Sequence, residues 1–163
     1  MVFSKYRKRI IEFIILGIIW TAIFMRIFFI DFVVVKGDSM YPTYVDRDMV
    51  FINKAALSIS RYDIVVIRLE QNKIIKRVIG LPNETIQIFN GHVYIDGEIL
   101  KDDIIDISID YAGIAESPIE LSDNCYFVLG DNREHSQDSR YEEIGLIDKK
   151  QIVGVVIKKV LHH

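Results

Sequence analysis

Two apolar runs in the middle of the chain, DIVVIRL at Asp63–Leu69 and KIIKRVIGL at Lys73–Leu81, indicate how the chain folds. Both runs are short and rich in Val and Ile, a composition that is typical of buried β-strands. Alternate side chains of a strand point to opposite faces, so Lys76 would share one face with Ile74 and Val78. Lys76 is then the one polar residue on an apolar face, although a lysine at a sheet edge is the simpler interpretation.

Similar strand patterns continue on both sides of these runs and predict a mainly β fold after the N-terminal segment. The pairs Asn90-Gly91 and Asp96-Gly97 are signals of tight turns and predict a meander over residues 85–100. The chain offers no amphipathic helix pattern in its β-rich part. The other expected strands are Phe32–Val35, Asp48–Lys54, Thr85–Asn90, His92–Asp96, Cys125–Gly130 and Gln151–Val160.

The N-terminal run Ile10–Ile30 has 21 residues and is almost entirely apolar. A helix of that length crosses a hydrocarbon core of roughly 30 Å, and the run is too long for a cleavable signal peptide. A buried core helix would need a polar face, which the run lacks. The basic residues Lys5, Arg7, Lys8 and Arg9 precede it, so the positive-inside rule predicts a single-pass protein of the cell membrane. Residues 1–9 would be cytoplasmic, residues 10–30 would span the bilayer, and residues 31–163 would form an extracytoplasmic domain.

Composition limits the number of domains and the kinds of ligand that fit this chain. The chain has 163 residues and a formal net charge of -3, which fits one domain and does not indicate nucleic-acid binding. No cluster of metal-ligand residues and no phosphate-binding loop is present, so no metal or other cofactor is expected. Residues 101–123 are acidic and irregular, and we expect an exposed, loop-rich insertion there. The lone Cys125 excludes an internal disulfide and is expected in the core.

The stretch VKGDSMYPT, residues 35–43, places Ser39 between a turn glycine and a proline. Most loop serines serve turns, but a nucleophilic serine would need a base to take its proton. The four histidines fit that role poorly, because they follow a turn glycine, lie in a polar loop or end the chain. A lysine can serve only when neutral, and burial can lower its pKa from about 10.4 by several units. Lys76, on its apolar face, is the candidate.

Five stretches together resemble type I signal peptidases, most of all the short form of Gram-positive bacteria. They are IILGIIWTAIF, GDSMYPT, RYDIVVI, KRVIGLP and GDNREHSQDSR, in that order along nearly the whole chain. The resemblance implies a β-rich signal-peptidase-like catalytic domain, with Ser39 as nucleophile and Lys76 as general base. It also implies a set of supporting residues: Ser136 bonded to the lysine, Asp131 and Asn132 at the start of the late loop, an Asp138–Arg140 ion pair, and Arg77 beside them.

The resemblance further implies a membrane-anchored serine endopeptidase that removes signal peptides from exported preproteins. Cleavage would follow small residues at the first and third positions before the cut, which need shallow apolar pockets. Our candidates for the pocket walls are Val33, Val35, Met40 and Ile75, while Lys36 would point away. The expected partners are preproteins and the lipid bilayer, with no nucleic acid.

Three positions depart from the family pattern. Gly37 lacks the hydroxyl that Gram-negative members use in the oxyanion hole, so the second donor is open. Asn83 replaces a glycine, and asparagine tolerates the positive φ that a turn there would need. Tyr62 replaces another glycine and predicts a locally different turn.

Two other functions share features with this sequence. A self-cleaving repressor-type peptidase shares the serine–lysine pair, but the Ala112-Gly113 dipeptide lies after Ser39 rather than before it. A signal-peptidase-like factor for pilin processing or surface-fibre assembly is the alternative function, although a non-catalytic version would not need both Ser39 and Lys76.

Overall fold

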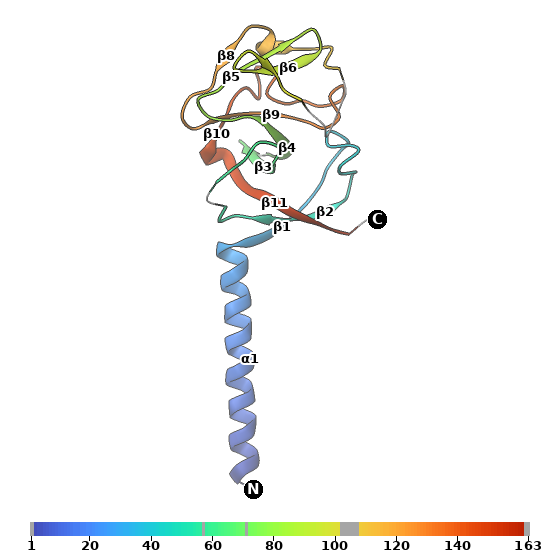
Figure 1. Ribbon diagram of the computed structural model, residues 1–163. Helices are drawn as coiled ribbons and strands as arrows, with labels where there is room; N and C mark the ends of the chain where they lie inside the picture. Colours follow the sequence, from blue (N-terminus) through green and yellow to red (C-terminus); the bar gives the residue numbers. More distant parts are fainter. Residues whose placement is uncertain (1, 57, 71, 102–107, 162–163) are drawn as a thin grey trace.

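The computed structural model describes residues 2–56, 58–70, 72–101 and 108–161, and consists of one long helix joined to a β-rich domain (Figure 1). Helix α1 spans Val2–Phe28, and its Tyr6–Ile27 segment is apolar, solvent-exposed and long enough to cross a membrane. The helix ends two residues before the expected boundary. Ile30 instead begins β1 and pairs with Asn53, because strand pairing there replaces the helical bonds.

A seven-stranded antiparallel sheet forms the main part of the domain, in the order β1-β2-β11-β3-β4-β9-β10. Strands β1, β2 and β11 lie nearest the helix in Figure 1. The order makes β1 an edge strand, and β9 pairs with β4 only from Arg77 onward. The strands are β1 Ile30–Val34, β2 Met49–Asn53, β3 Ile64–Leu69, β4 Asn72–Gly80, β9 Cys125–Leu129, β10 Ile147–Asp148 and β11 Ile152–Leu161.

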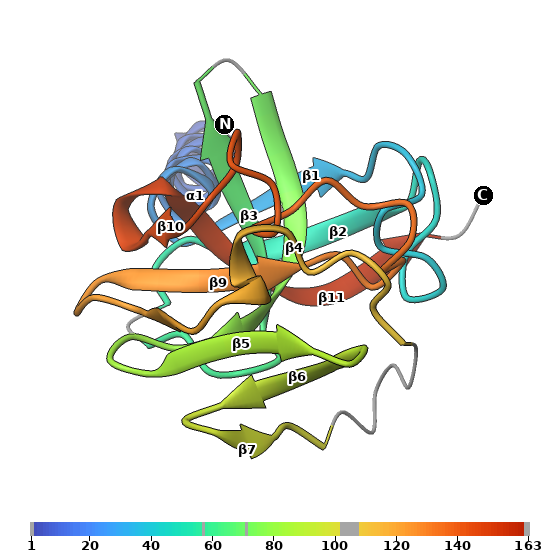
Figure 2. The same cartoon turned by 90° about the horizontal axis from the view of Figure 1, so that it is seen from above.

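A four-stranded sheet in the order β7-β6-β5-β8 lies at the end of the domain away from the helix (Figure 1). Figure 2 shows β5, β6 and β7 side by side beneath β9. The expected meander is confirmed, with positive φ at Asn90 and Asp96 in its two turns. The strands are β5 Thr85–Phe89, β6 His92–Ile95, β7 Glu98–Ile99 and β8 Ile119–Glu120, and two short 3₁₀ helices are Gly113–Glu116 and Lys149–Gln151.

The core confirms the two faces expected for β4. Ile74 and Val78 pack in one apolar cluster with Val65 and Val128, whereas Ile75 packs in another cluster with residues of β1 and β2. Lys76 therefore lies on the apolar face that the alternation predicts, and only 3% of it is exposed.

All eight expected strands are present, with ends within two residues of those expected, but two predictions about this part of the chain need correction. Within the expected insertion, residues 108–123 are less exposed than expected, because Ile109, Ala115 and Leu121 are buried in the core beside the small sheet. Cys125 begins β9 and is only half-buried. The acidic residues at 102, 103 and 106 lie outside the described part of the chain.

The two substituted turns keep the backbone conformation that glycine favours. Asn83 has a φ of 68°, as its tolerance of positive φ predicts, and Tyr62 has a φ of 72°. Tyr62 thus occupies the left-handed conformation that glycine adopts with less strain. Bonds on both sides hold this strained residue in place, since Tyr62 N donates to Val78 O at 2.8 Å and Tyr62 O accepts from Arg77 Nη1 at 2.9 Å.

Candidate active site

Ser39 lies in the turn between β1 and β2 and is half-buried. The chain turns there through Gly37, whose φ is 74° and whose N–H donates to Asp46 Oδ1 at 2.8 Å. Two bonds join this turn to the loop that follows β9. Asn132 N donates to Ser39 O at 3.1 Å, and Asn132 Nδ2 donates to Asp38 O at 3.2 Å. Asn132 therefore holds the turn that carries Ser39 (the nucleophile turn) to the late loop, residues 130–140, through one bond from its backbone and one from its side chain.

Lys76 extends from β4 on the same face as Ile74 and Val78. Burial lowers the pKa of Lys76 from its ordinary 10.5 to about 8, because an ammonium loses its hydration among apolar groups. Two nearby charges have smaller, opposing effects: the Asp138 carboxylate raises this pKa and the Arg140 guanidinium lowers it. A substantial fraction of Lys76 is therefore neutral at mildly alkaline pH.

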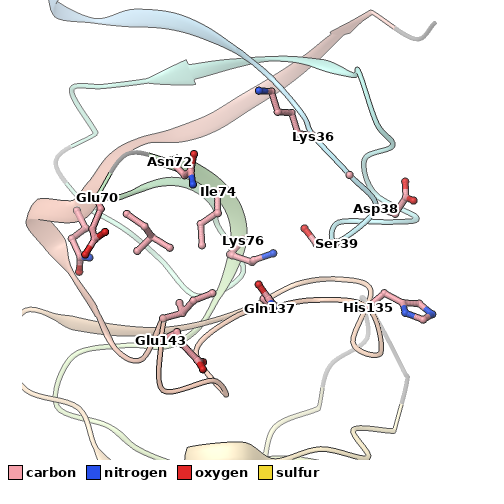
Figure 3. Close-up of a pocket in the computed structure, with 14 residues that line it drawn as sticks. Lys36, Asp38, Ser39, Glu70, Asn72, Ile74, Lys76, His135, Gln137 and Glu143 are labelled. Atoms are coloured by element: carbon pink, nitrogen blue, oxygen red, sulfur yellow. The ribbon is translucent and has the colours of Figure 1, made fainter.

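Ser39 and Lys76 line one open cleft of about 1090 Å³. Figure 3 shows the amine of Lys76 pointing toward Ser39, with Gln137 on the opposite side of Lys76 from Ile74. His135 also lines the cleft but is exposed. In the described part of the chain, no three His, Cys, Asp or Glu side chains are grouped so that they could hold a metal ion.

Arg77, next to Lys76 on β4, forms a buried ion pair with Asp131 at the start of the late loop. Arg77 Nε lies 2.7 Å from Asp131 Oδ1, and Arg77 Nη2 lies 2.6 Å from Asp131 Oδ2. The hydroxyl of Thr43, from the nucleophile turn, also donates to Asp131. This carboxylate therefore joins three segments of the site. The contact of Thr43 was not anticipated, although Thr43 belongs to the GDSMYPT motif.

Arg140 and Asp138 form a second buried ion pair within the late loop, at 2.8 Å and 2.9 Å. The sequence had suggested that Arg77 joins this pair. Arg77 instead pairs separately with Asp131. Asp138 Oδ2 also accepts from Gly130 N at 3.0 Å, and Arg140 Nη2 donates to Ser136 O at 3.2 Å. These bonds fix the backbone of the loop on both sides of Ser136.

Ser136 is buried, and its Oγ has no hydrogen-bond partner among the described residues. The bond to Lys76 that the resemblance implies is therefore not formed in this structure. The hydroxyl lies against Gly130, where an added Cβ would be 2.1 Å from Ser136 Oγ and 2.5 Å from Ser39 O. Any side chain at this position would disturb both Ser136 and the nucleophile turn.

The four expected wall residues, Val33, Val35, Met40 and Ile75, line a second cavity of about 670 Å³. Ser39 and Lys76 also border this cavity, so it opens directly onto the two candidate catalytic groups. Lys36 borders both cavities, but its amine points away from Ser39 and Lys76 (Figure 3), as expected. The apolar wall residues expected from the sequence thus lie together beside Ser39.

The family described as "Signal peptidase, peptidase S26" matches residues 7–161. The chain belongs to the signal peptidase family. It is similar to Signal peptidase I S of Bacillus subtilis (strain 168), with 36% identity over 162 residues that cover 91% of this chain and 87% of that protein. Signal peptidase I of Bacillus amyloliquefaciens is 38% identical over 148 residues, which cover 82% of this chain and 77% of that protein. A crystal structure of a signal peptidase I from Enterococcus faecalis V583 matches with a TM-score of 0.51 and 31% identity, over 61% of this chain and 97% of that chain.

As a member of this signal peptidase family, the chain is a serine peptidase on a mainly β fold with an apolar N-terminal helix that fits a membrane anchor. The relatives above are each described as a signal peptidase I. Removal of signal peptides is therefore favoured over the alternative of a dedicated role in pilin processing or fibre assembly.

Proposed function

We propose that this signal peptidase cleaves exported preproteins with Ser39 as nucleophile and Lys76 as general base. One observation carries the assignment: Lys76 is buried beside Ser39 in a shared cleft, and its pKa is lowered to about 8. A lysine with an ordinary pKa would be almost fully protonated at physiological pH and could not accept a proton. This lysine becomes a usable base close to neutral pH.

In the proposed reaction, the neutral amine of Lys76 takes the proton of Ser39 Oγ while that oxygen attacks the scissile carbonyl carbon. The resulting ammonium returns the proton to the departing amine of the mature protein, which leaves an acyl-enzyme. Water then attacks the ester with the same amine as base, and the signal peptide is released from Ser39. The Ser39 N–H would stabilise the oxyanion, whereas Gly37 N–H is already donated to Asp46.

We assign Ser136 the role of orienting Lys76 once substrate is bound. Its hydroxyl is buried and bonds to no group in the part of the chain that the structure describes, a state that costs free energy unless a partner is gained when substrate binds. Hydrogen bonds between catalytic groups are often long in a free enzyme and shorten in the substrate complex. The Asp138–Arg140 and Arg77–Asp131 pairs would hold the loop that carries Ser136, with Asn132 fixed to the nucleophile turn.

The substrate would bind as an extended strand between β1 and the first half of β4. Support comes from the pairing pattern: β1 is an edge strand, and residues 72–76 of β4 pair with β3 alone. Both segments line the apolar cavity beside Ser39. In an added strand alternate side chains point to one face, so small residues at the first and third positions before the cut would enter this cavity.

The proposed location is the cell membrane, with residues 1–9 in the cytoplasm and the catalytic domain outside. Basic residues at the N-terminal end of α1 support this orientation. The outer face of β1 and β2 presents Phe32, Val34 and Phe51 to solvent beside the end of the helix, which suits contact with lipid. The cleft would then open near the bilayer from which a signal peptide emerges.

The test is the pH dependence of precursor cleavage by wild type, Ser39→Ala and Lys76→Arg. Wild-type kcat/KM, which reports the free enzyme, should rise as pH increases through about 8 and then level off, because the neutral amine replaces the ammonium. Lys76→Arg stays protonated and should lose roughly 100-fold or more of kcat, as should Ser39→Ala. Near-normal turnover by the arginine variant would exclude Lys76 as the base.

A further inference from the structure

The segment that follows the undescribed residues 102–107 packs against the outer side of the late loop. Ile114 N donates to Arg140 O at 2.9 Å, and Arg140 Nη1 donates to Tyr111 O at 3.3 Å. The rings of Tyr111 and Tyr141 are also in contact, with their centroids 5.1 Å apart. Arg140 is thus held from outside the loop through both its side chain and its own backbone.

Gly113 lies at the point of closest approach. Its φ is 57°, and a Cβ added there would be 2.0 Å from Arg140 O and 2.8 Å from Arg140 C. The obstacle is backbone, which cannot swing aside as the end of a side chain can. Only glycine meets both the positive φ and the close approach, so this position is fixed by its contact with Arg140.

Arg140 connects this contact to the late loop, which carries Ser136. Its guanidinium binds Asp138 and reaches Arg133 O at 2.7 Å and Ser136 O at 3.2 Å, and only 2% of the residue is exposed. A displaced Arg140 would therefore move the backbone that places Ser136 next to Gly130 and the nucleophile turn. Asp138 and Arg140 are also the two nearby charges with the largest influence on Lys76.

We propose that Tyr111 O, Gly113 and Ile114 N–H form an Arg140 clamp, which positions the Ser136 loop for the cleavage reaction and is not merely a part of the core. The proposal rests on the function assigned above. The three residues act through Arg140 and contact no substrate. Residues 111–114 belong to the segment that the sequence predicts to be an exposed, loop-rich insertion. The proposal gives them an influence on the turnover rate.

Gly113→Ala and Gly97→Ala form a matched pair that tests the clamp. Gly97 also has a positive φ, 85°, but an added Cβ would meet nothing within 4 Å. Both variants carry the backbone strain of alanine at positive φ, and only Gly113→Ala presses on Arg140. Gly113→Ala should lower kcat on a soluble signal-peptide substrate by roughly 100-fold, the size of effect that a shift of about 1 Å produces. KM should change little, because the pocket residues are not moved.

Two further readouts separate positioning from lost stability. The midpoint of the pH–kcat profile should move to higher pH in Gly113→Ala, because a loosened loop admits water to Lys76. Amide hydrogen exchange of residues 131–140 should become faster in Gly113→Ala and stay at wild-type rates in Gly97→Ala. Where Gly113→Ala gives no folded protein, Ile114→Pro replaces it and is compared with Ile114→Ala. Both changes remove the Ile114 side chain from the core, but only proline also removes the N–H that binds Arg140.

The exchange measurement does not depend on activity, so it tests the clamp even if wild type fails to cleave signal peptides. If wild type cleaves and requires Ser39 and Lys76, but Gly113→Ala matches Gly97→Ala, or Ile114→Pro matches Ile114→Ala, in kcat, pH midpoint and exchange, the clamp is overturned and the proposed function stands. A loss of thermal stability alone, with these three quantities unchanged, would likewise overturn it.

Discussion

Ser136 and Ser139 are two buried serines of one loop with opposite hydrogen-bonding states. Ser139 Oγ accepts from Val128 N at 3.0 Å, whereas Ser136 Oγ has no partner within the described chain. Ser139→Ala should destabilise the fold by about 1–3 kcal/mol, because the Val128 N–H would be left buried and unpaired. Ser136→Ala should leave the free energy of unfolding unchanged or higher, yet lower kcat roughly tenfold to 100-fold by releasing Lys76.

Denaturant titration and steady-state kinetics of the two variants measure these effects separately. A Ser136→Ala enzyme with wild-type kcat across the pH range would show that the hydroxyl does not orient the base. An equal loss of stability in both variants would show that Ser136 is bonded in solution.

The sequence predicts the position of a site residue well only where a pattern of side-chain types indicates it. Lys76 is recognisable because one polar residue interrupts an apolar strand face, and the apolar walls follow from alternation in Val33 and Val35. The contacts of Tyr111 were missed because its backbone carbonyl does the binding, and every residue has one. The amine of Lys36 points away from Ser39, as expected for the residue that follows the inward-facing Val35.

At the scale of elements, the Arg77–Asp131 pair connects β4 to the loop after β9, and Arg47 offers a control. Arg77→Gln should destabilise the domain by about 3–5 kcal/mol, because Asp131 is fully buried and would lose its charged partner. Arg47→Gln should change stability by less than about 0.5 kcal/mol, since the Arg47 side chain is 83% exposed and lies 3.6 Å from Asp46. Urea denaturation midpoints decide this comparison, and similar shifts in both variants would show that the buried pair does not hold these elements together.

Strand prediction succeeded where a strand has at least four residues with an apolar pattern of its own. The missed strands β7, β8 and β10 have two residues each, so they exist only through pairing, as when Ile147 and Asp148 pair with Tyr126 and Cys125. The burial of residues 109–121 was missed for a related reason. Ile109, Ala115 and Leu121 are six positions apart, and Gly113, Ser117 and Pro118 interrupt the chain between them, so no continuous apolar pattern of a strand or a helix is visible.

At the scale of the molecule, the helix and the domain share an apolar surface. Phe51 on β2 pairs with Phe32 on β1, and about 40% of each is exposed on the outer face of the sheet. Contacts at the end of α1 set this face beside the helix, since Lys54 Nζ donates to Ile27 O at 2.7 Å and Arg26 lies over the Phe32 ring. A monomeric soluble domain would gain nothing from such a face, but a membrane-anchored one can bury it in lipid.

Phe51→Ser should therefore impair cleavage of a precursor embedded in the same bilayer and spare cleavage of a soluble peptide in detergent. Burial of one phenylalanine is worth about 1.5–3 kcal/mol. The rate of precursor cleavage in the bilayer should therefore fall roughly tenfold when the domain loses this contact with lipid. Ile99→Ser is the control, because Ile99 is 52% exposed but lies on β7 in the sheet farthest from the helix (Figure 1). The quantity to measure is the ratio of the two cleavage rates for each full-length variant in proteoliposomes and in detergent. Equal ratios for Phe51→Ser and Ile99→Ser would mean that the face of β1 and β2 does not rest on lipid, and that the helix alone tethers a freely moving domain.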